Sequence, residues 1–285
     1  MRCSLRIILY YLKRDLKSAI KFKVNTILSF LSFVFNIAVL LIVALIARNV
    51  LEKYLSGYGG DYLIYLMIGI VAYDVLNLCQ KAPYESIYSA FGTRLLEALR
   101  LLPVKPHVAL AGLSIGSIAS SALRIIAYIV VGAVIGAYVR VSLSQALLCI
   151  LFLAIGAICY LGLGFIAASM FFLIQAKSDD PVNWLSDICV YVASGLYYPV
   201  SVLPAPLQWL SCTIPHTYVF DALRKILTGN AYAKTLPVHF FCNNTVIFDL
   251  CVLILYAIIL VPLGLFLLDL GFRKSRMDGR LSWWT

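Results

Sequence analysis

Long uninterrupted apolar runs constrain this chain more than any other feature of its sequence. Crossing about 30 Å of hydrocarbon as a helix takes about 20 apolar residues, and six runs of this order are bounded by charges or by Gly and Pro clusters. Hydrophobic residues fill 62% of the positions and charged residues 13%, a balance that needs hydrocarbon as its solvent. The sequence predicts an all-α polytopic membrane protein and excludes a disordered chain, a coiled coil and an ordinary cytosolic enzyme.

The six predicted transmembrane helices follow one another with no loop long enough to form an enzyme domain. Two of them exceed 30 residues, so each tilts or extends beyond the bilayer. Together they form one transmembrane domain over residues 27–285. The spans are 27–47, 62–79, 108–139, 143–175, 184–200 and 246–269.

Residues 1–26 precede the first span and show helical periodicity. Leu5, Leu9 and Leu12 recur on one side, while Arg6 and Lys13 lie on the opposite arc. This pattern predicts an amphipathic helix that lies in the interface of the lipid bilayer on its cytoplasmic side. The alternative is a basic flank that serves only as a topology signal.

The distribution of positive charge predicts the orientation of the chain. A net charge of +10 is typical of nucleic-acid binding or of the inner face of a membrane. The basic residues flank the apolar body, which favours the membrane and no nucleic acid. With the N-terminus inside, the inner segments hold 16 Lys and Arg and the outer segments hold 6. Both termini, including a basic tail over 271–285, are therefore predicted to be cytoplasmic.

The chain carries no recognisable catalytic, cofactor or metal motif. Gly57–Gly60 is followed by Asp61 in place of Lys, so no phosphate-binding loop is present. None of the three histidines has a second histidine or a carboxylate at helical ligand spacing, and no nucleophile and base cluster together. We expect no catalytic, cofactor-binding or metal-binding residue here, and any ATP and Mg²⁺ would be bound by a partner chain.

Eight cysteines show no paired metal-binding spacing, and most lie inside apolar runs. We interpret these as buried thiols that fill volume. Cys212 and Cys242 both fall in a predicted outer segment, so a single disulfide between them stays open.

The inner segment over 80–107 predicts two short helices. The first covers 84–91 and is capped by Gly92, and the second starts at Thr93 and stops before Pro103. Such helices offer a charged face to a partner, although a capped loop that merely joins two spans is an alternative. The charged residues on this segment are Glu85, Arg94, Glu97 and Arg100.

The outer segment over 199–229 is broken by prolines yet is too apolar for a solvated loop. Pro199, Pro204 and Pro215 divide it into pieces too short to span. We expect it to enter the bilayer and return as re-entrant helices that pack against the spans. Trp209 and Tyr218 also suit an interfacial aromatic belt.

Three charged residues fall within predicted spans. Arg124 lies near the centre of the third span, where a cation must face protein or water. Asp74 is its preferred partner and Asp187 the alternative. A structural ion pair and a position on a transport pathway both remain open.

Two segments resemble the signatures of the permeases of type-2 ATP-binding-cassette exporters. Residues 92–106 read GTRLLEALRLLPVKP, and residues 194–218 read SGLYYPVSVLPAPLQWLSCTIPHTY. Both occur in the expected order, between an amphipathic N-terminal helix and the last of six spans. The resemblance therefore extends over nearly the whole chain.

This resemblance implies a permease that pairs with a second permease and works by alternating access, driven by two separate ATPase subunits. The segment 84–102 matches the family's cytoplasmic coupling helix, residues 1–26 its connecting helix and 199–229 its outer re-entrant helices. The short outer segment favours a compact exporter of a prokaryotic plasma membrane. The charges offered to the ATPase would be Glu85, Arg94, Glu97 and Arg100.

The alternative function is a proton- or sodium-coupled secondary transporter that uses Asp74 and Asp187. That class predicts an inverted repeat between the halves of the chain, and none is convincing. The cargo, and whether the second permease is identical or a sister chain, stay open.

Overall fold

The computed structural model describes residues 28, 31, 35, 42, 44–48, 50–92, 141–174, 180–230, 233–241 and 244–277. Within this part of the chain every regular element is a helix, as the predicted all-α class requires. Several predicted features lie outside it: the N-terminal helix over 1–26, most of the first span, the third span, and Arg94, Glu97, Arg100 and Arg124.

Helix α3 covers Tyr62–Gly92 and contains the second predicted span. The prediction of a separate short helix from residue 84 is wrong, because α3 passes Lys81 and Pro83 without a break. A helical proline lacks one donor and crowds the preceding turn. At this point α7 packs closely through Gly164, where an added Cβ would lie 2.8 Å from the Pro83 ring. Packing thus maintains the helix where hydropathy suggested an end.

Helix α7 covers Leu143–Leu173 and confirms the fourth predicted span as an apolar helix of crossing length. Its start is fixed by Ser142. The Ser142 hydroxyl accepts the main-chain N–H of Gln145, and the Gln145 side chain accepts the main-chain N–H of Ser142. This reciprocal capping box satisfies two donors that the helix end leaves open.

Helix α11 covers Thr245–Met277 and confirms the start of the last predicted span. It continues past residue 269, so the predicted basic tail begins inside the helix. Helices α3, α7 and α11 are the three in the described part of the chain that are long and apolar enough to cross a membrane. The count of six spans extends beyond the described residues.

The fifth predicted span is wrong as a single crossing helix. Helix α8 covers only Pro181–Ala193, 13 residues, which is about 20 Å long. It begins on Asp180, whose carboxylate accepts main-chain N–H groups, and it ends before Gly195, whose φ of 77° suits glycine. Hydropathy missed this end because the sequence is equally apolar on both sides of the turn.

Short helices make up the segment after this turn. Element η3 covers Val200–Val202, α9 covers Ala205–Ser211 and α10 covers Pro215–Thr228. Pro204 is the N-cap of α9 and Pro215 the first residue of α10, positions where a proline costs the helix no hydrogen bond. The remaining short elements are η1 (Glu52–Tyr54), η2 (Ser56–Tyr58) and η4 (Pro237–Phe241).

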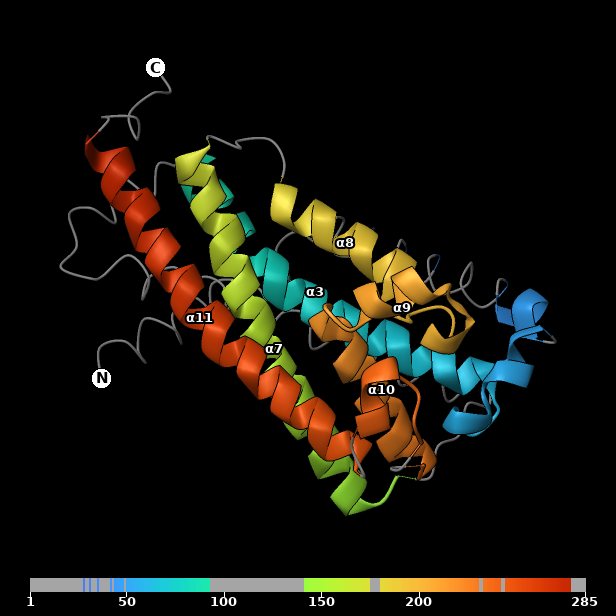
Figure 1. Ribbon diagram of the computed structural model, residues 1–285. Coiled ribbons are helices and arrows are strands. Elements are labelled where there is room, and N and C mark those ends of the chain that lie inside the picture. The colour runs from blue at the N-terminus through green and yellow to red at the C-terminus, as the bar shows by residue number, and fades with distance from the viewer. Residues whose placement is uncertain are drawn as a thin grey trace.

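The three long helices run in the same direction. On α7, Gly156 lies against Leu76 of α3 and Gly164 lies against Pro83, so the residue numbers rise together. A similar series of glycine contacts joins α7 to α11, and the two lie side by side in Figure 1. Spans that run in the same direction need connections that return to the starting side, as the predicted order requires. The end at which these helices begin is predicted to face outward and is called the outer end below.

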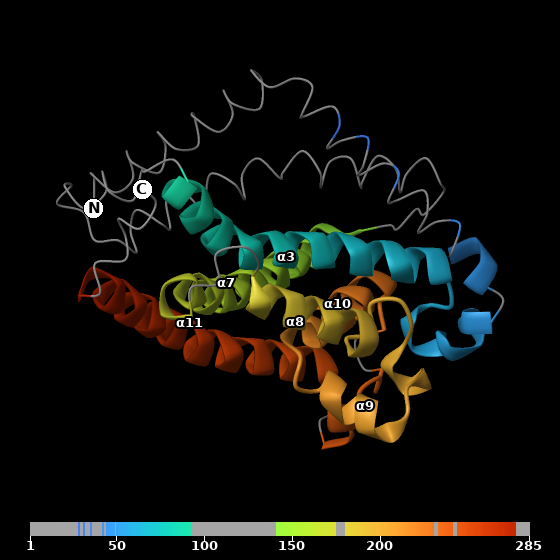
Figure 2. The ribbon, with the colours of Figure 1, turned by 90° about the horizontal axis from the view of Figure 1, so that it is seen from above.

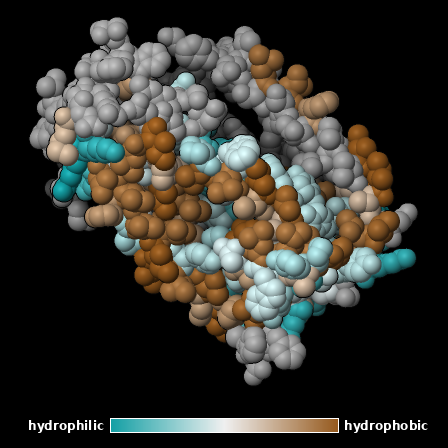
Figure 3. All heavy atoms as spheres, turned by 45° about the horizontal axis from the view of Figure 1, so that its top comes forward, coloured by the Kyte–Doolittle hydropathy of each residue, from teal (hydrophilic) through white to brown (hydrophobic). Residues whose placement is uncertain are grey.

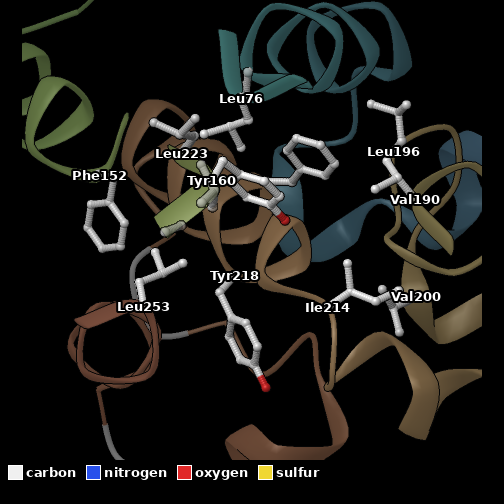
Figure 4. Close-up of a cluster of buried hydrophobic side chains, with 14 of the residues drawn as sticks. Leu76, Phe152, Tyr160, Val190, Leu196, Val200, Ile214, Tyr218, Leu223 and Leu253 are labelled. Carbon is white, nitrogen blue, oxygen red and sulfur yellow. The ribbon is translucent and has the colours of Figure 1, made fainter. Parts of the chain in front are cut away.

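Helix α10 fills the space between the long helices. Its residues 215–226 are all buried, and Figure 2 shows it between α3 and α11. In the cluster of Figure 4, Tyr218 and Leu223 of α10 lie with Phe152 and Tyr160 of α7 and with Leu253 of α11. The segment predicted to be re-entrant therefore supplies the centre of the core.

The outward faces of α7, α8 and α11 expose large apolar side chains, which gather as broad hydrophobic areas in Figure 3. Water-soluble monomers rarely expose continuous apolar areas of this kind, whereas lipid solvates them. Examples are Leu143 (78% exposed), Trp184 (68%), Ile258 (64%) and Phe266 (63%).

Candidate functional site

Glu85 is the one predicted coupling residue that the structure describes. It is exposed near the C-terminal end of α3. Its neighbours Tyr84 and Ile87 are buried, and the Tyr84 ring packs edge-on against Phe171 of α7 at 6.1 Å. Glu85 is thus exposed at a point where α3 packs firmly against α7. Its role in coupling stays a prediction.

Asp187 joins α8 to α3 through a network of polar side chains. Its carboxylate accepts hydrogen bonds from Tyr73 at 2.7 Å, from Asn77 at 3.2 Å and from Asn183 at 3.3 Å. The Lys81 ammonium lies 3.6 Å away. The cation that the structure places beside Asp187 is therefore Lys81 of the neighbouring helix.

Other polar contacts extend this junction, which we call the α3–α8 seam. Ser186 donates to the Gln80 side chain at 3.1 Å, and the hydroxyls of Tyr73 and Tyr191 are 2.8 Å apart. A polar seam at membrane depth must face protein or water. Asp74 is half-buried on the same helix, and its predicted pairing with Arg124 lies outside the described residues.

The outer segment separates its predicted residues into buried and exposed groups. Pro199 and Tyr218 are buried, and the Tyr218 hydroxyl donates to the carbonyl of Cys212 at 2.6 Å. Trp209 of α9 is 60% exposed, as an interfacial aromatic residue would be. Cys212 is a free thiol, and its suggested partner Cys242 lies outside the described residues.

Arg224 of α10 is a buried cation that the sequence reasoning did not single out. Only 2% of it is exposed, and its guanidinium donates to the main-chain carbonyls of Tyr65 at 3.1 Å, Gly195 at 2.7 Å and Leu196 at 2.9 Å. Its Cζ also lies 3.4 Å from the centre of the Tyr65 ring. One side chain thus joins α10 to α3 and to the turn after α8.

A second buried charged group lies at the outer end and is called the outer cluster: Tyr58, Asp221, Lys225, His239 and Asp249. The Lys225 ammonium is 2.5 Å from the Asp221 carboxylate, which also accepts hydrogen bonds from the hydroxyls of Tyr58 and Thr235. His239 Nε2 lies 2.8 Å from Asp249. Residues from η2, α10, η4 and α11 meet here, so the cluster fixes the outer loops to the helices.

The electrostatics of the outer cluster favour a neutral histidine. Desolvation lowers the pKa of His239 to about 4, against the pull of Asp221. Desolvation alone would raise the pKa of Asp221, but the adjacent Lys225 ammonium brings that pKa below its ordinary value. Burial therefore favours the uncharged imidazole of His239 beside the ion pair of Lys225 and Asp221.

The same residues raise the question of a metal site. Ligand atoms of Asp221, His239 and Asp249 lie within 4.8 Å of one another. However, the Lys225 ammonium lies between two of them, 2.5 Å from Asp221 and 3.3 Å from His239 Nδ1. A cation already occupies the position that a metal would take, so these residues fit an ion-pair network better than a metal centre.

The sequence did contain a signal for both buried groups. Asp221, Arg224 and Lys225 recur at helical spacing within an apolar segment, where charges need partners once the segment is buried. Interpreting the segment by its prolines and aromatic residues left these charges unassigned. The search for metal ligands at helical spacing likewise missed the carboxylates that the fold brings to His239.

Comparison with known families identifies the family of this chain. The family model described as ABC-2 type transporter matches residues 8–228, a range that includes both signature segments and every element from α3 to α10. No protein of curated function matches the chain. The matched range is most of the sequence, and the apolar helices suit a membrane protein. The chain therefore belongs to the ABC-2 type transporter family and is a membrane-spanning permease of an ATP-binding-cassette transporter.

Proposed function

We propose that this permease is part of an exporter, in which it forms the translocation path with a second permease and is driven by two separate ATPase subunits. Both termini lie on the cytoplasmic side of a prokaryotic plasma membrane. ATP and Mg²⁺ are bound by the ATPase subunits, and the permease contributes only the path and its movement. Family membership and the positive charge of the predicted inner segments support this proposal.

The observation that carries the mechanism is the continuity of α3. Glu85 is exposed near one end of a helix that runs without interruption back to Tyr62 at the outer end. A contact between the ATPase and the coupling segment over 84–102 therefore acts on a rigid helix that crosses the bundle. Closure of the ATPases on ATP would displace this helix as a body and alternate the access of the path.

An ion-coupled transporter is a less economical account of the same residues. It needs Asp187 to exchange a proton or a sodium ion during the cycle. In the structure, this carboxylate is paired with Lys81 and accepts three hydrogen bonds from side chains. The geometry suits a structural junction between two helices.

The test is the double substitution Glu97→Ala with Arg100→Ala in the permease reconstituted with its ATPase. We expect loss of the ATP hydrolysis that the permease stimulates, with no change in thermal unfolding of the permease. The control is Arg48→Ala, which removes an exposed ion pair with Glu52 before α3. Unchanged stimulation in the double variant would overturn the assignment of the coupling segment.

A further inference from the structure

Helix α3 carries close contacts to α10 and its surroundings near its outer end. The Tyr62 hydroxyl donates to the carbonyl of Tyr197 at 2.8 Å, and the Tyr65 hydroxyl donates to the carbonyl of Gly195 at 2.6 Å. Tyr58, just before the helix, donates to Asp221 of α10. Three tyrosines thus place the outer end of α3 against the segment that contains α10.

Arg224 adds a contact of a different kind, because its guanidinium reaches three carbonyls on two separate backbone segments. Among the described residues, its acceptors are carbonyls of α3 and of the turn after α8, and none of them is a carboxylate. Main-chain carbonyls cannot move away independently of their helix or turn. A buried guanidinium that loses them is left unpaired at high cost, so the three elements are held in one arrangement.

The backbone of α3 is shaped to admit this side chain. At Gly69, an added Cβ would collide with the terminal guanidinium nitrogen of Arg224 and would lie 3.2 Å from the carbonyl oxygen of Leu196. A glycine weakens a helix interior, but a larger residue at this position would require the Arg224 side chain to shift. Gly69 and Arg224 therefore act as a pair.

We propose that Arg224 is a positioning residue that locks α10 to α3, so that a displacement of α3 at its Glu85 end is carried to the outer helices with no hinge between them. This inference rests on the proposed function for the source of the displacement. The lock itself follows from the contacts of Arg224 and Gly69. It gives the outer segment a direct mechanical connection to the coupling end of the permease.

The experiment measures the distance between spin labels at Tyr88, exposed near the end of α3, and at Asn230, exposed just after α10. The labels are introduced as noncanonical amino acids, because native cysteines are present, and the full chain is studied in lipid nanodiscs with its ATPase. The wild type is expected to give one narrow distance that stays the same with and without ATP.

Two variants break the lock by different routes. Arg224→Gln removes the charge and cannot reach all three carbonyls, and Gly69→Ala displaces the guanidinium with a single methyl group. Each is expected to broaden the distance or add a second population, while Arg224→Lys restores part of the narrow component. Gly271→Ala, which crowds Phe172 at 3.2 Å on the opposite side of the bundle, is the matched control and is expected to keep the wild-type distance.

The outcomes separate the two proposals. A narrow, unchanged distance in both lock variants, or a wild-type distance that changes with ATP, would overturn the lock. If the lock variants broaden the distance but Glu97→Ala with Arg100→Ala leaves ATP hydrolysis unchanged, the lock holds and the assigned coupling segment fails. Gly69→Ala keeps the test decisive where Arg224→Gln does not fold. If the variants lowered the melting temperature but left the distance between the spin labels unchanged, Arg224 would contribute only to packing and would not lock α10 to α3.

Discussion

The outer cluster and the contact between α7 and α11 hold the same bundle together in opposite ways. The outer cluster buries Asp221, Lys225, His239 and Asp249 with none of them more than 2% exposed. The contact between α7 and α11, called the glycine seam below, depends on absent side chains: Gly162, Gly264 and Gly271 let the two helices approach.

This difference separates two sources of stability in a membrane bundle. One is close packing between helices, and the other is the pairing of buried charges. Lipid is as apolar as leucine, so the glycine seam gains stability mainly from the close packing of the two helices. The outer cluster gains stability only when every charge has its partner, because each charge left alone is expensive. The glycine seam therefore determines how closely α7 and α11 approach each other. The outer cluster determines which loops contact which helices.

The largest expected effect comes from breaking the charged cluster. Asp221→Ala removes the partner of Lys225 and the acceptor of Tyr58 and Thr235. We expect a loss of about 3–5 kcal/mol in the free energy of unfolding, because a buried ammonium is left uncompensated. Denaturant unfolding in detergent measures it. Asp221→Leu with Lys225→Met should lose clearly less, and an equal loss would contradict the charge-pairing account.

The free energy of unfolding should also depend on pH through the outer cluster, whereas the glycine seam contributes no titratable group. His239 faces Asp221, Lys225 and Asp249, and its pKa in the fold is about 4, below the ordinary value of about 6.5. The unfolded chain takes up the proton first, so the free energy of unfolding falls as pH decreases from about 6.5 to about 4, by about 3 kcal/mol.

Thermal unfolding at a series of pH values measures this decrease. His239→Gln should remove this contribution, so its curve should be shallower than that of the wild type. If stability depended on pH equally in the wild type and in His239→Gln, His239 would not be the source of the pH dependence.

Overpacking the glycine seam should have an intermediate effect. In Gly162→Ala, the new Cβ would lie 2.8 Å from the Leu260 carbonyl carbon of α11. We expect a loss of about 1–3 kcal/mol from the forced separation of the helices, measured by denaturant unfolding. Ile158→Ala, on the half-exposed face of the same helix, is the control and should stay within about 0.5 kcal/mol. Equal losses would mean that close approach is not what stabilises the seam.

The smallest expected effect is at the α3–α8 seam. Asp187→Asn removes the charge that faces Lys81, but both side chains are partly exposed, at 24% and 36%. We expect a loss below about 1 kcal/mol in the same unfolding measurement. A loss as large as that of Asp221→Ala would show that this seam behaves like the outer cluster.

Sequence reasoning found the fold where a local pattern fixed a boundary. Hydropathy placed the start of the fourth span at residue 143, where α7 begins, and the prolines predicted breaks in the outer segment, where α9 begins after Pro204 and α10 begins at Pro215. It failed where a neighbour changed the outcome. Pro83 does not end α3 because α7 packs against it through Gly164, and the fifth span is cut short at Gly195 inside an apolar run.

The sequence predicted which segments carry functional residues, but it did not predict which buried residues pair with one another. The signature segments predicted a coupling region and outer helices, and the family match covers both ranges. The buried partners of Arg224 are carbonyls more than 25 positions away in the chain, and a carbonyl has no sequence signature. His239 and Asp249 meet through the path of the η4 loop, which no helical spacing describes.

The amino-acid sequence by itself determined that this chain needs a membrane, which family it resembles, and where most of its long apolar helices start, since these depend on hydropathy and on caps that act within a few residues. Only the tertiary structure decided which charges are buried, that α3 continues to Gly92, and that α10 lies at the centre of the bundle. Burial and pairing are properties of groups brought together from distant positions, and their free energy exists only once the chain has packed.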